Sequence, residues 1–195
     1  MKTFYFRIIF LLFGIIGICH FGYAQSLNNK ETIVDKSGKY KDSITTHIWN
    51  PSLIADSLLF DGIQQYTFPE SSIIYTPPKT FRLDEQGNIV HDWTGSSIQY
   101  KILNTNYFKI IPTITKETFE KQGFSYINQL QITTDQKNEG TLFLVKFISN
   151  NIEYERIVFF IGNQHQTLWL NINYPVMMKS LLYEVFEKSL LTIKL

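Results

Sequence analysis

The sequence predicts an α+β fold, an antiparallel sheet with helices on both of its faces. Short segments rich in β-branched and aromatic residues follow one another closely over residues 126–174 and are separated by tight turns, which is typical of an antiparallel meander. An amphipathic segment follows at 176–191. Two of the strand segments are apolar on both faces. Because such strands must be covered on both sides, we expect one layer of sheet between helices.

The first 24 residues have the organisation of an export signal. Lys2 and Arg7 precede an uncharged apolar run from Ile8 to Cys19, and Gly22-Tyr23-Ala24 supplies the small residues that a signal peptidase requires. The run is shorter than the ~20 residues that span a bilayer. The sequence therefore predicts cleavage before Gln25 and a periplasmic or extracellular mature protein with no membrane span.

A lipoprotein signal is the alternative interpretation of this leader. Cys19 is the only cysteine of the chain, and its acylation would tether the protein to a membrane. A small residue normally precedes the acylated cysteine, whereas Ile18 stands here, so we favour soluble release. Loss of Cys19 with the leader leaves a domain without disulfides, which must be held together by packing.

The composition gives no indication of a nucleic-acid or anionic-lipid partner. The whole chain has 18 basic and 17 acidic residues, and removal of the leader with Lys2 and Arg7 leaves a net charge of −1. A balance of this kind provides no field that would attract nucleic acid or an anionic lipid surface. We therefore expect no nucleic-acid partner, and the oligomeric state stays open.

The sequence predicts four parts: a signal peptide over 1–24, a polar tether over 25–47, a short helix and connection over 48–67, and an α/β domain over 68–195. The tether has too few apolar residues to offset the entropy of ordering. In the third part, Asn50 and Pro51 form a helix start and Gly62 a helix stop.

Three strands and one helix are expected in the first half of the domain. The strand segments are 72–76, which ends at Pro77-Pro78, then 89–93 and 97–103. The helix is expected over 112–122, with Thr115 as its cap and Gly123 as its left-handed end.

Four further strands and a closing helix complete the predicted domain. The strands are 126–133, 141–148, 152–161 and 167–174, and the helix is 176–191. The apolar stripe of the closing helix covers one face of the sheet. The other face then needs the helix at 115–122 or the segment at 50–61.

Six short motifs resemble those of small exported bacterial proteins with the PsbP-like fold. They are Ile74-Tyr75-Thr76-Pro77-Pro78-Lys79-Thr80-Phe81, Gly95-Ser96-Ser97-Ile98, Lys121-Gln122-Gly123, Phe159-Phe160-Ile161-Gly162, Asn173-Tyr174-Pro175 and Ser189-Leu190-Leu191-Thr192-Ile193. The resemblance covers roughly residues 68–195. It implies an α/β/α sandwich, a fold shared with the PsbP subunit of photosystem II and with a nuclear import factor that binds the GTPase Ran. It implies no activity, because members of this fold bind unrelated partners.

The sequence contains no motif for catalysis, metal binding or a cofactor, and we expect no cofactor. His47, His91 and His165 lie in separate segments, whereas a metal site needs clustered ligands. Gly95-Ser96-Ser97 is interpreted as a turn into a strand and not as a nucleophile loop. Glu153 and Glu155 are interpreted as a solvated strand end.

Three residues remain as candidates for partner binding: Trp93, Trp169 and His91. His91 and Trp93 lead into the turn at Gly95, and loops of this kind often carry binding residues. Trp169 points away from Leu168 and Leu170 and would be an exposed anchor unless a helix covers it. Both positions also have a purely structural interpretation, as a cap of the sheet and as a covered core residue.

The leading functional hypothesis is an exported, non-enzymatic protein that binds another protein or assists a cell-envelope complex. The alternative is an enzyme or small-ligand carrier with an aromatic-lined pocket between the sheet and a covering helix. A filled interior with an exposed aromatic surface favours the first, and a concave pocket with converging polar groups favours the second.

Overall fold

The computed structural model describes residues 33–34, 40–41 and 65–195. The chain divides into two units, Met1–Thr46 and His47–Leu195. In the first unit, β1 (Ile33–Val34) and β2 (Tyr40–Lys41) form an antiparallel pair. The predicted signal peptide with Cys19, most of the predicted tether and the predicted helix at 50–61 lie outside the described residues.

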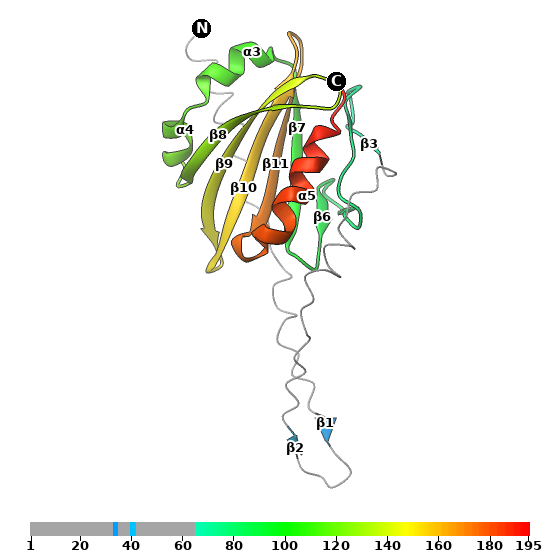
Figure 1. Cartoon of the computed structure of the whole chain (residues 1–195), viewed down its shortest axis with the longest axis vertical. Helices are drawn as coiled ribbons and strands as arrows, with labels where there is room; N and C mark the ends of the chain where they lie inside the picture. Colours follow the sequence, from blue (N-terminus) through cyan, green and yellow to red (C-terminus); the bar gives the residue numbers. More distant parts are fainter. Residues whose placement is uncertain (1–32, 35–39, 42–64) are drawn as a thin grey trace. The chain divides into compact units, whose positions relative to one another are not determined.

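The second unit is built on a seven-stranded antiparallel sheet with the order β5-β6-β7-β11-β10-β9-β8 (Figure 1). A separate pair is formed by β3 and β4. This confirms the predicted α+β class. The strands are β3 (Tyr66–Thr67), β4 (Ile74–Tyr75), β5 (Arg82–Leu83), β6 (Ile89–His91), β7 (Ser96–Leu103), β8 (Ser125–Thr133), β9 (Glu139–Ser149), β10 (Ile152–Gly162) and β11 (Thr167–Pro175).

One face of the sheet packs against the closing helix. After a turn of 3₁₀ helix, η4 (Val176–Met178), the chain forms α5 (Lys179–Leu191). Strand alternation places every second side chain on this face, and there they form one apolar core with α5. Its fully buried members include Ile98, Ile157, Phe159, Leu170, Ile172, Leu182 and Phe186.

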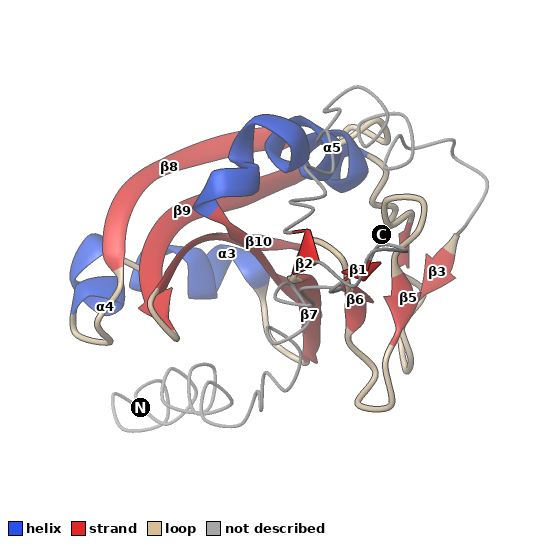
Figure 2. Ribbon diagram, turned by 90° about the horizontal axis from the view of Figure 1, so that it is seen from below, coloured by secondary structure: helices blue, strands red, loops and turns tan. Residues whose placement is uncertain are grey.

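The opposite face is covered at the β8–β9 side by short helices, so that α5 and these helices lie on either side of the sheet (Figure 2). They are α3 (Tyr107–Ile110), η3 (Ile111–Thr113) and α4 (Lys116–Glu120). Phe119 of α4 is fully buried, and its ring centroid lies 5.2 Å from that of Phe143 on β9. The helix expected at 115–122 therefore covers part of the second face.

The predicted helix over 112–122 is shorter than expected. Pro112 lies in the 3₁₀ turn η3, and Ile114 has an extended backbone that separates this turn from α4. Thr115 caps α4 as expected: the Thr118 hydroxyl accepts a hydrogen bond of 3.2 Å from its N–H group. Gly123 has a φ of +81°, the left-handed conformation predicted for it.

The strand expected at 72–76 is also shorter. Only Ile74–Tyr75 pairs, and it pairs with β3 and not with the main sheet. Strand β5, which the sequence analysis did not expect, forms a hairpin with β6. The turn of this hairpin is stabilised by Asp84, whose carboxylate accepts hydrogen bonds from the N–H groups of Gln86 and Asn88.

Candidate binding surface at the β6–β7 turn

The turn between β6 and β7 presents the most exposed tryptophan of the described domain. Trp93 lies in this turn with 53% of its surface exposed. His91 is the last residue of β6 and is half-buried. The structure thus brings two of the three predicted site residues together, with ring centroids 6.4 Å apart in an edge-on arrangement.

A row of aromatic rings connects Trp93 to the core. The ring of Phe186 on α5 meets Phe81 edge-on at 5.7 Å. Phe81 is buried and stacks on the imidazole of His91 at 5.1 Å, and His91 in turn contacts Trp93. Because the inner end of the row is part of the close-packed core, the exposed end is held in place.

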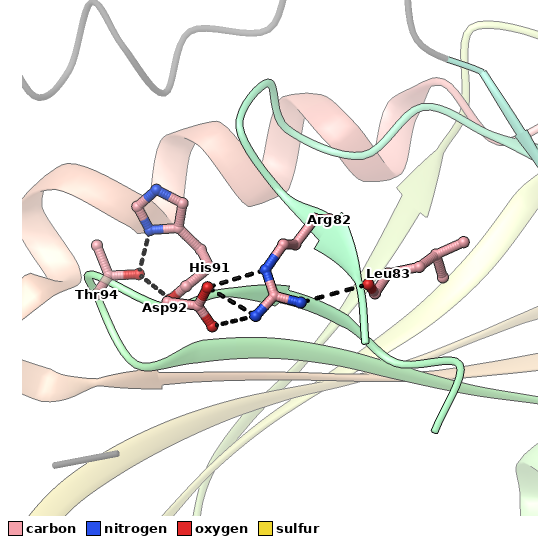
Figure 3. A network of polar contacts seen from close by, with 5 residues as sticks. All are labelled: Arg82, Leu83, His91, Asp92 and Thr94. Atoms are coloured by element: carbon pink, nitrogen blue, oxygen red, sulfur yellow. Dashed lines mark hydrogen bonds and ion pairs between the residues drawn. The ribbon is translucent and has the colours of Figure 1, made fainter. Parts of the chain in front are cut away.

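An ion pair ties the same turn to the neighbouring strand (Figure 3). Arg82 of β5 donates hydrogen bonds of 2.9 Å from both Nε and Nη2 to the two carboxylate oxygens of Asp92. A bidentate pair of this kind fixes direction as well as distance. Asp92 immediately precedes Trp93, and Leu83, next to Arg82, is 49% exposed.

Hydrogen bonds within the turn add to this rigidity. His91 Nδ1 lies 2.9 Å from the hydroxyl of Thr94, and that hydroxyl donates a bond of 2.9 Å to Ser96 Oγ. The Thr94 hydroxyl therefore joins the His91 ring to the first residue of β7. Gly95 closes the turn with a φ of +67° and donates its N–H to the His91 carbonyl oxygen at 3.1 Å.

The imidazole of His91 is held in its neutral form. Burial lowers the pKa of His91 below its ordinary value and outweighs the opposite effect of the Asp92 carboxylate. A neutral ring fits the stacking on the apolar ring of Phe81. At neutral pH the surface therefore has the Arg82–Asp92 pair as its charged part and Trp93 as its aromatic part.

Trp169 lies elsewhere and is not an exposed anchor. It is on β11, only 5% exposed, and its ring stacks on Phe160 with a centroid distance of 6.2 Å and an angle of 8° between the planes. It points away from Leu168 and Leu170, as the strand alternation predicts. The covered-core interpretation is therefore right for Trp169, and it has no part in the exposed surface.

The face of the sheet that carries Trp169 also contains a buried polar chain. Arg156 Nε donates to Asn173 Oδ1 at 2.6 Å, and Asn173 Nδ2 donates to Ser97 Oγ at 3.1 Å. The Arg156 guanidinium lies over the rings of Phe124 and Phe147, at 5.0 and 4.8 Å from their centroids. These contacts link β7, β11, β10 and β9 and hold the strands together.

The interpretation of Glu155 as part of a solvated strand end is wrong. Its side chain is 1% exposed, and its carboxylate accepts hydrogen bonds from the Tyr174 hydroxyl at 2.7 Å and from Lys179 Nζ at 2.9 Å. Glu155 shares its face of β10 with the apolar residues Ile157 and Phe159, so the approach of α5 buries it. Glu153, two residues earlier, is exposed as expected.

Side chains fill the space between the sheet and α5, where the alternative hypothesis places an aromatic-lined pocket. The core residues on both sides of this space are at most 8% exposed. A shallow, open depression occurs instead on the outer surface of α5 and is lined by Val176, Met177, Lys179, Ser180, Tyr183 and Glu184. Within residues 33–34, 40–41 and 65–195, no three His, Cys, Asp or Glu side chains group as metal ligands do. No helix in these residues is long and apolar enough to cross a membrane.

Phe81 and the Arg82–Asp92 pair were missed by sequence reasoning. A two-residue strand has no periodicity that could reveal it. The signal that could have found it is the Asp84–Gly87 turn, which implies that the residues before it pair with those after it. Such a hairpin brings the side chains of Arg82 and Asp92 to the same side of the β5–β6 pair, where they bond to each other.

Comparison with known proteins supports the fold. No family model and no curated protein matches the sequence. The structure is similar to that of the cyanobacterial PsbP protein (CyanoP) of Synechocystis sp. PCC 6803, with a TM-score of 0.51 and 9% identity over 68% of this chain and 91% of that one.

Two weaker similarities have TM-scores of 0.49. One is to a protein of Bacteroides thetaiotaomicron, at 14% identity over 67% of this chain and 47% of that one. The other is to LpqN, described as involved in cell envelope biogenesis of Mycobacterium tuberculosis, at 14% identity over 65% of this chain and 87% of that one. The similarity to CyanoP confirms the PsbP-like fold, and an identity of 9% shows the fold alone.

Proposed function

We propose that the protein is exported and binds another protein through the surface formed by Trp93, His91 and the Arg82–Asp92 pair, which we call the Trp93 surface. The observation that carries this proposal is the position of Trp93: half-exposed, yet supported by a row of rings that begins in the core. A rigid aromatic side chain loses little conformational entropy on binding.

The chemistry around Trp93 fits the anatomy of a protein interface. Tryptophan and arginine are enriched among the residues that contribute most to binding, and a polar rim normally surrounds them. Here the Arg82–Asp92 pair provides the polar rim, and both of its side chains are more than half exposed. The fitting partner is a protein with an apolar pocket for an indole ring and polar groups at the edge of that pocket.

Export is the second part of the proposal, and the leader sequence supports it. A partner of an exported protein is found in the cell envelope or outside the cell, so a cell-envelope complex is the expected assembly. N-terminal sequencing of the protein recovered after export tests this part. A start at Gln25 is expected, and an acylated Cys19 would replace soluble release with a membrane anchor.

Site-specific photo-crosslinking in living cells tests the binding part. A photoreactive residue at position 93 is expected to give a discrete crosslinked product with one partner protein. Trp93→Ala should then reduce capture of that partner at least tenfold, since truncation of a central aromatic anchor typically costs about 2 kcal/mol or more. Asp92→Asn should reduce capture less, because it weakens the Arg82–Asp92 ion pair and leaves the Trp93 ring in place.

Phe108 provides the matched control. It is an exposed aromatic residue on α3, and Figure 1 shows α3 at the end of the sheet opposite β6. Crosslinking from position 108 should give no such product, and Phe108→Ala should leave capture unchanged. Equal capture by Trp93→Ala and the unmodified protein, in variants that melt alike, would refute the Trp93 surface.

A further inference from the structure

The two edges of the main sheet differ in how they are protected against pairing with another strand. An edge strand presents a row of unpaired N–H and C=O groups, and proteins commonly protect it by making it short or by placing charges or proline on it. β5 has two residues, one of which is Arg82, and Pro77-Pro78 shortly precedes it. This edge is protected.

The other edge, β8, has little of this protection. It has nine residues, Ser125–Thr133, and pairs only with β9 among the residues that the structure describes. None of the nine residues is charged and none is proline. Seven of the nine are exposed, including Ile127 and Leu130 at 40% and 39%. Figure 1 shows β8 at the outer side of the sheet.

One irregularity limits the part of β8 that can pair. The register with β9 shifts between Tyr126 and Asn128, which leaves Ile127 as the extra residue of a bulge. Bulges disturb pairing at an edge. From Asn128 to Thr133 the register is regular, so this stretch offers an uninterrupted row of backbone donors and acceptors.

We propose that β8 is a self-association edge, at which a second copy of this chain pairs antiparallel with the first through residues 128–132. The sequence of this stretch favours a second copy, because Gln129 and Gln131 lie symmetrically about Leu130 and antiparallel self-pairing then places like residues opposite each other. The stretch has no charged residue, so this pairing brings no like charges together. With a two-fold axis at Leu130, the unpaired backbone N–H and C=O groups of each strand bond to those of the other in the same way.

The two-fold arrangement also matches the side chains. Leu130 on the axis faces Leu130 of the second copy, and Gln129 faces Gln131, whose Oε1 also accepts a hydrogen bond of 3.2 Å from the Thr141 hydroxyl on β9. Asn128, Leu130 and Ile132 lie on the α5 face, as their pairing with β9 shows for Leu130 opposite Leu142. Antiparallel pairing keeps these residues on one continuous face. Five residue pairs bury less than a stable interface requires, so the association is weak and depends on concentration.

Sedimentation equilibrium of the exported protein over a concentration range tests this inference. A reversible monomer–dimer equilibrium is expected. Gln129→Lys combined with Gln131→Lys places like charges directly opposite each other and should raise the dissociation constant at least tenfold. Gln164→Lys, at an exposed position in the β10–β11 turn, is the matched control and should leave it unchanged.

Oxidative crosslinking tests the register. Leu130→Cys in a Cys19→Ser background introduces a single thiol on the proposed axis and should give a disulfide-linked dimer. Phe108→Cys in the same background is the control and should stay monomeric. A protein that remains monomeric at the highest concentrations, or a dimer that the two lysines do not weaken, would overturn the inference. If the protein remains monomeric, β8 is not a self-association edge, and a strand of another protein is the remaining candidate for pairing with it.

Discussion

The hydroxyl of Tyr174 donates a hydrogen bond of 2.7 Å to the buried carboxylate of Glu155. Tyr174 is on β11 and Glu155 on β10, and Lys179, the first residue of α5, binds the same carboxylate at 2.9 Å. One carboxylate thus joins two neighbouring strands to the start of the helix that covers them. Because the Glu155 carboxylate lies among apolar neighbours, the loss of any one of its hydrogen bonds should lower the stability of the fold.

Removal of the Tyr174 hydroxyl should destabilise the fold. We expect Tyr174→Phe to lower the free energy of unfolding by about 1.5–3 kcal/mol, the range for a hydrogen bond to a charged group. Urea unfolding at pH 7 measures this value. Tyr183→Phe on the outer side of α5 is the control, and an equal loss in both variants would contradict a special role for the bond to Glu155.

The same pair predicts how stability changes at high pH. Burial, and then the hydrogen bond to Glu155, raise the pKa of Tyr174 well above its ordinary value. The unfolded chain therefore loses this proton first, and the contribution to stability is complete below about pH 10 and is lost as the pH rises further. Tyr174→Phe should show a shallower decline in unfolding free energy between pH 9 and 11.

The lowered pKa of His91 predicts that the free energy of unfolding also depends on pH in the acidic range. Because its pKa is lowered in the folded protein, the unfolded chain binds a proton first as the pH falls below about 6.5. Stability is then complete above this pH and declines as the pH falls through the lowered value. His91→Gln should reduce the decline measured by urea unfolding between pH 7 and 5.5.

If His91→Gln shows the same decline as the unmodified protein, burial against Phe81 does not keep the imidazole neutral, and the description of the turn needs revision.

The two tryptophans predict opposite outcomes of the same substitution. Trp169→Ala removes a buried ring that stacks on Phe160 and should lower the free energy of unfolding by about 3–5 kcal/mol. Trp93→Ala removes the exposed end of the aromatic row and should change it by about 0.5 kcal/mol or less, as surface substitutions do. Equal losses would mean that Trp93 also belongs to the core.

The meander was predictable because it depends on local signals. The four strands from β8 to β11 begin and end within about two residues of the predicted segments, since alternation and tight turns are properties of neighbouring residues. The same alternation placed Trp169 on the correct face of β11. What covers that face depends on other elements, so periodicity alone left both interpretations of Trp169 open.

Glu155 and β5 show where sequence reasoning fails. Alternation places Glu155 on the core face, but its charge favoured a solvated position, and its partners Tyr174 and Lys179 come from other elements. Strand β5 consists of two residues that pair with β6, too few for a periodic signal, so only the turn that follows them indicates the hairpin. The support of Trp93 by Phe81 depends on this same hairpin, so the site was visible in the sequence only as two residues near a turn.

The closing helix provides the most direct test of the fold. Val185 of α5 is 7% exposed and belongs to the core between the helix and the sheet. Val185→Asp places an unpaired charge there, which costs several kcal/mol and is comparable to the ~5–15 kcal/mol stability of a whole domain. We expect loss of soluble folded protein, measured by recovery and by circular dichroism. Glu184→Asp, at the neighbouring exposed position, should fold normally, and a Val185→Asp variant that melts like the unmodified protein would show that α5 does not dock through this face.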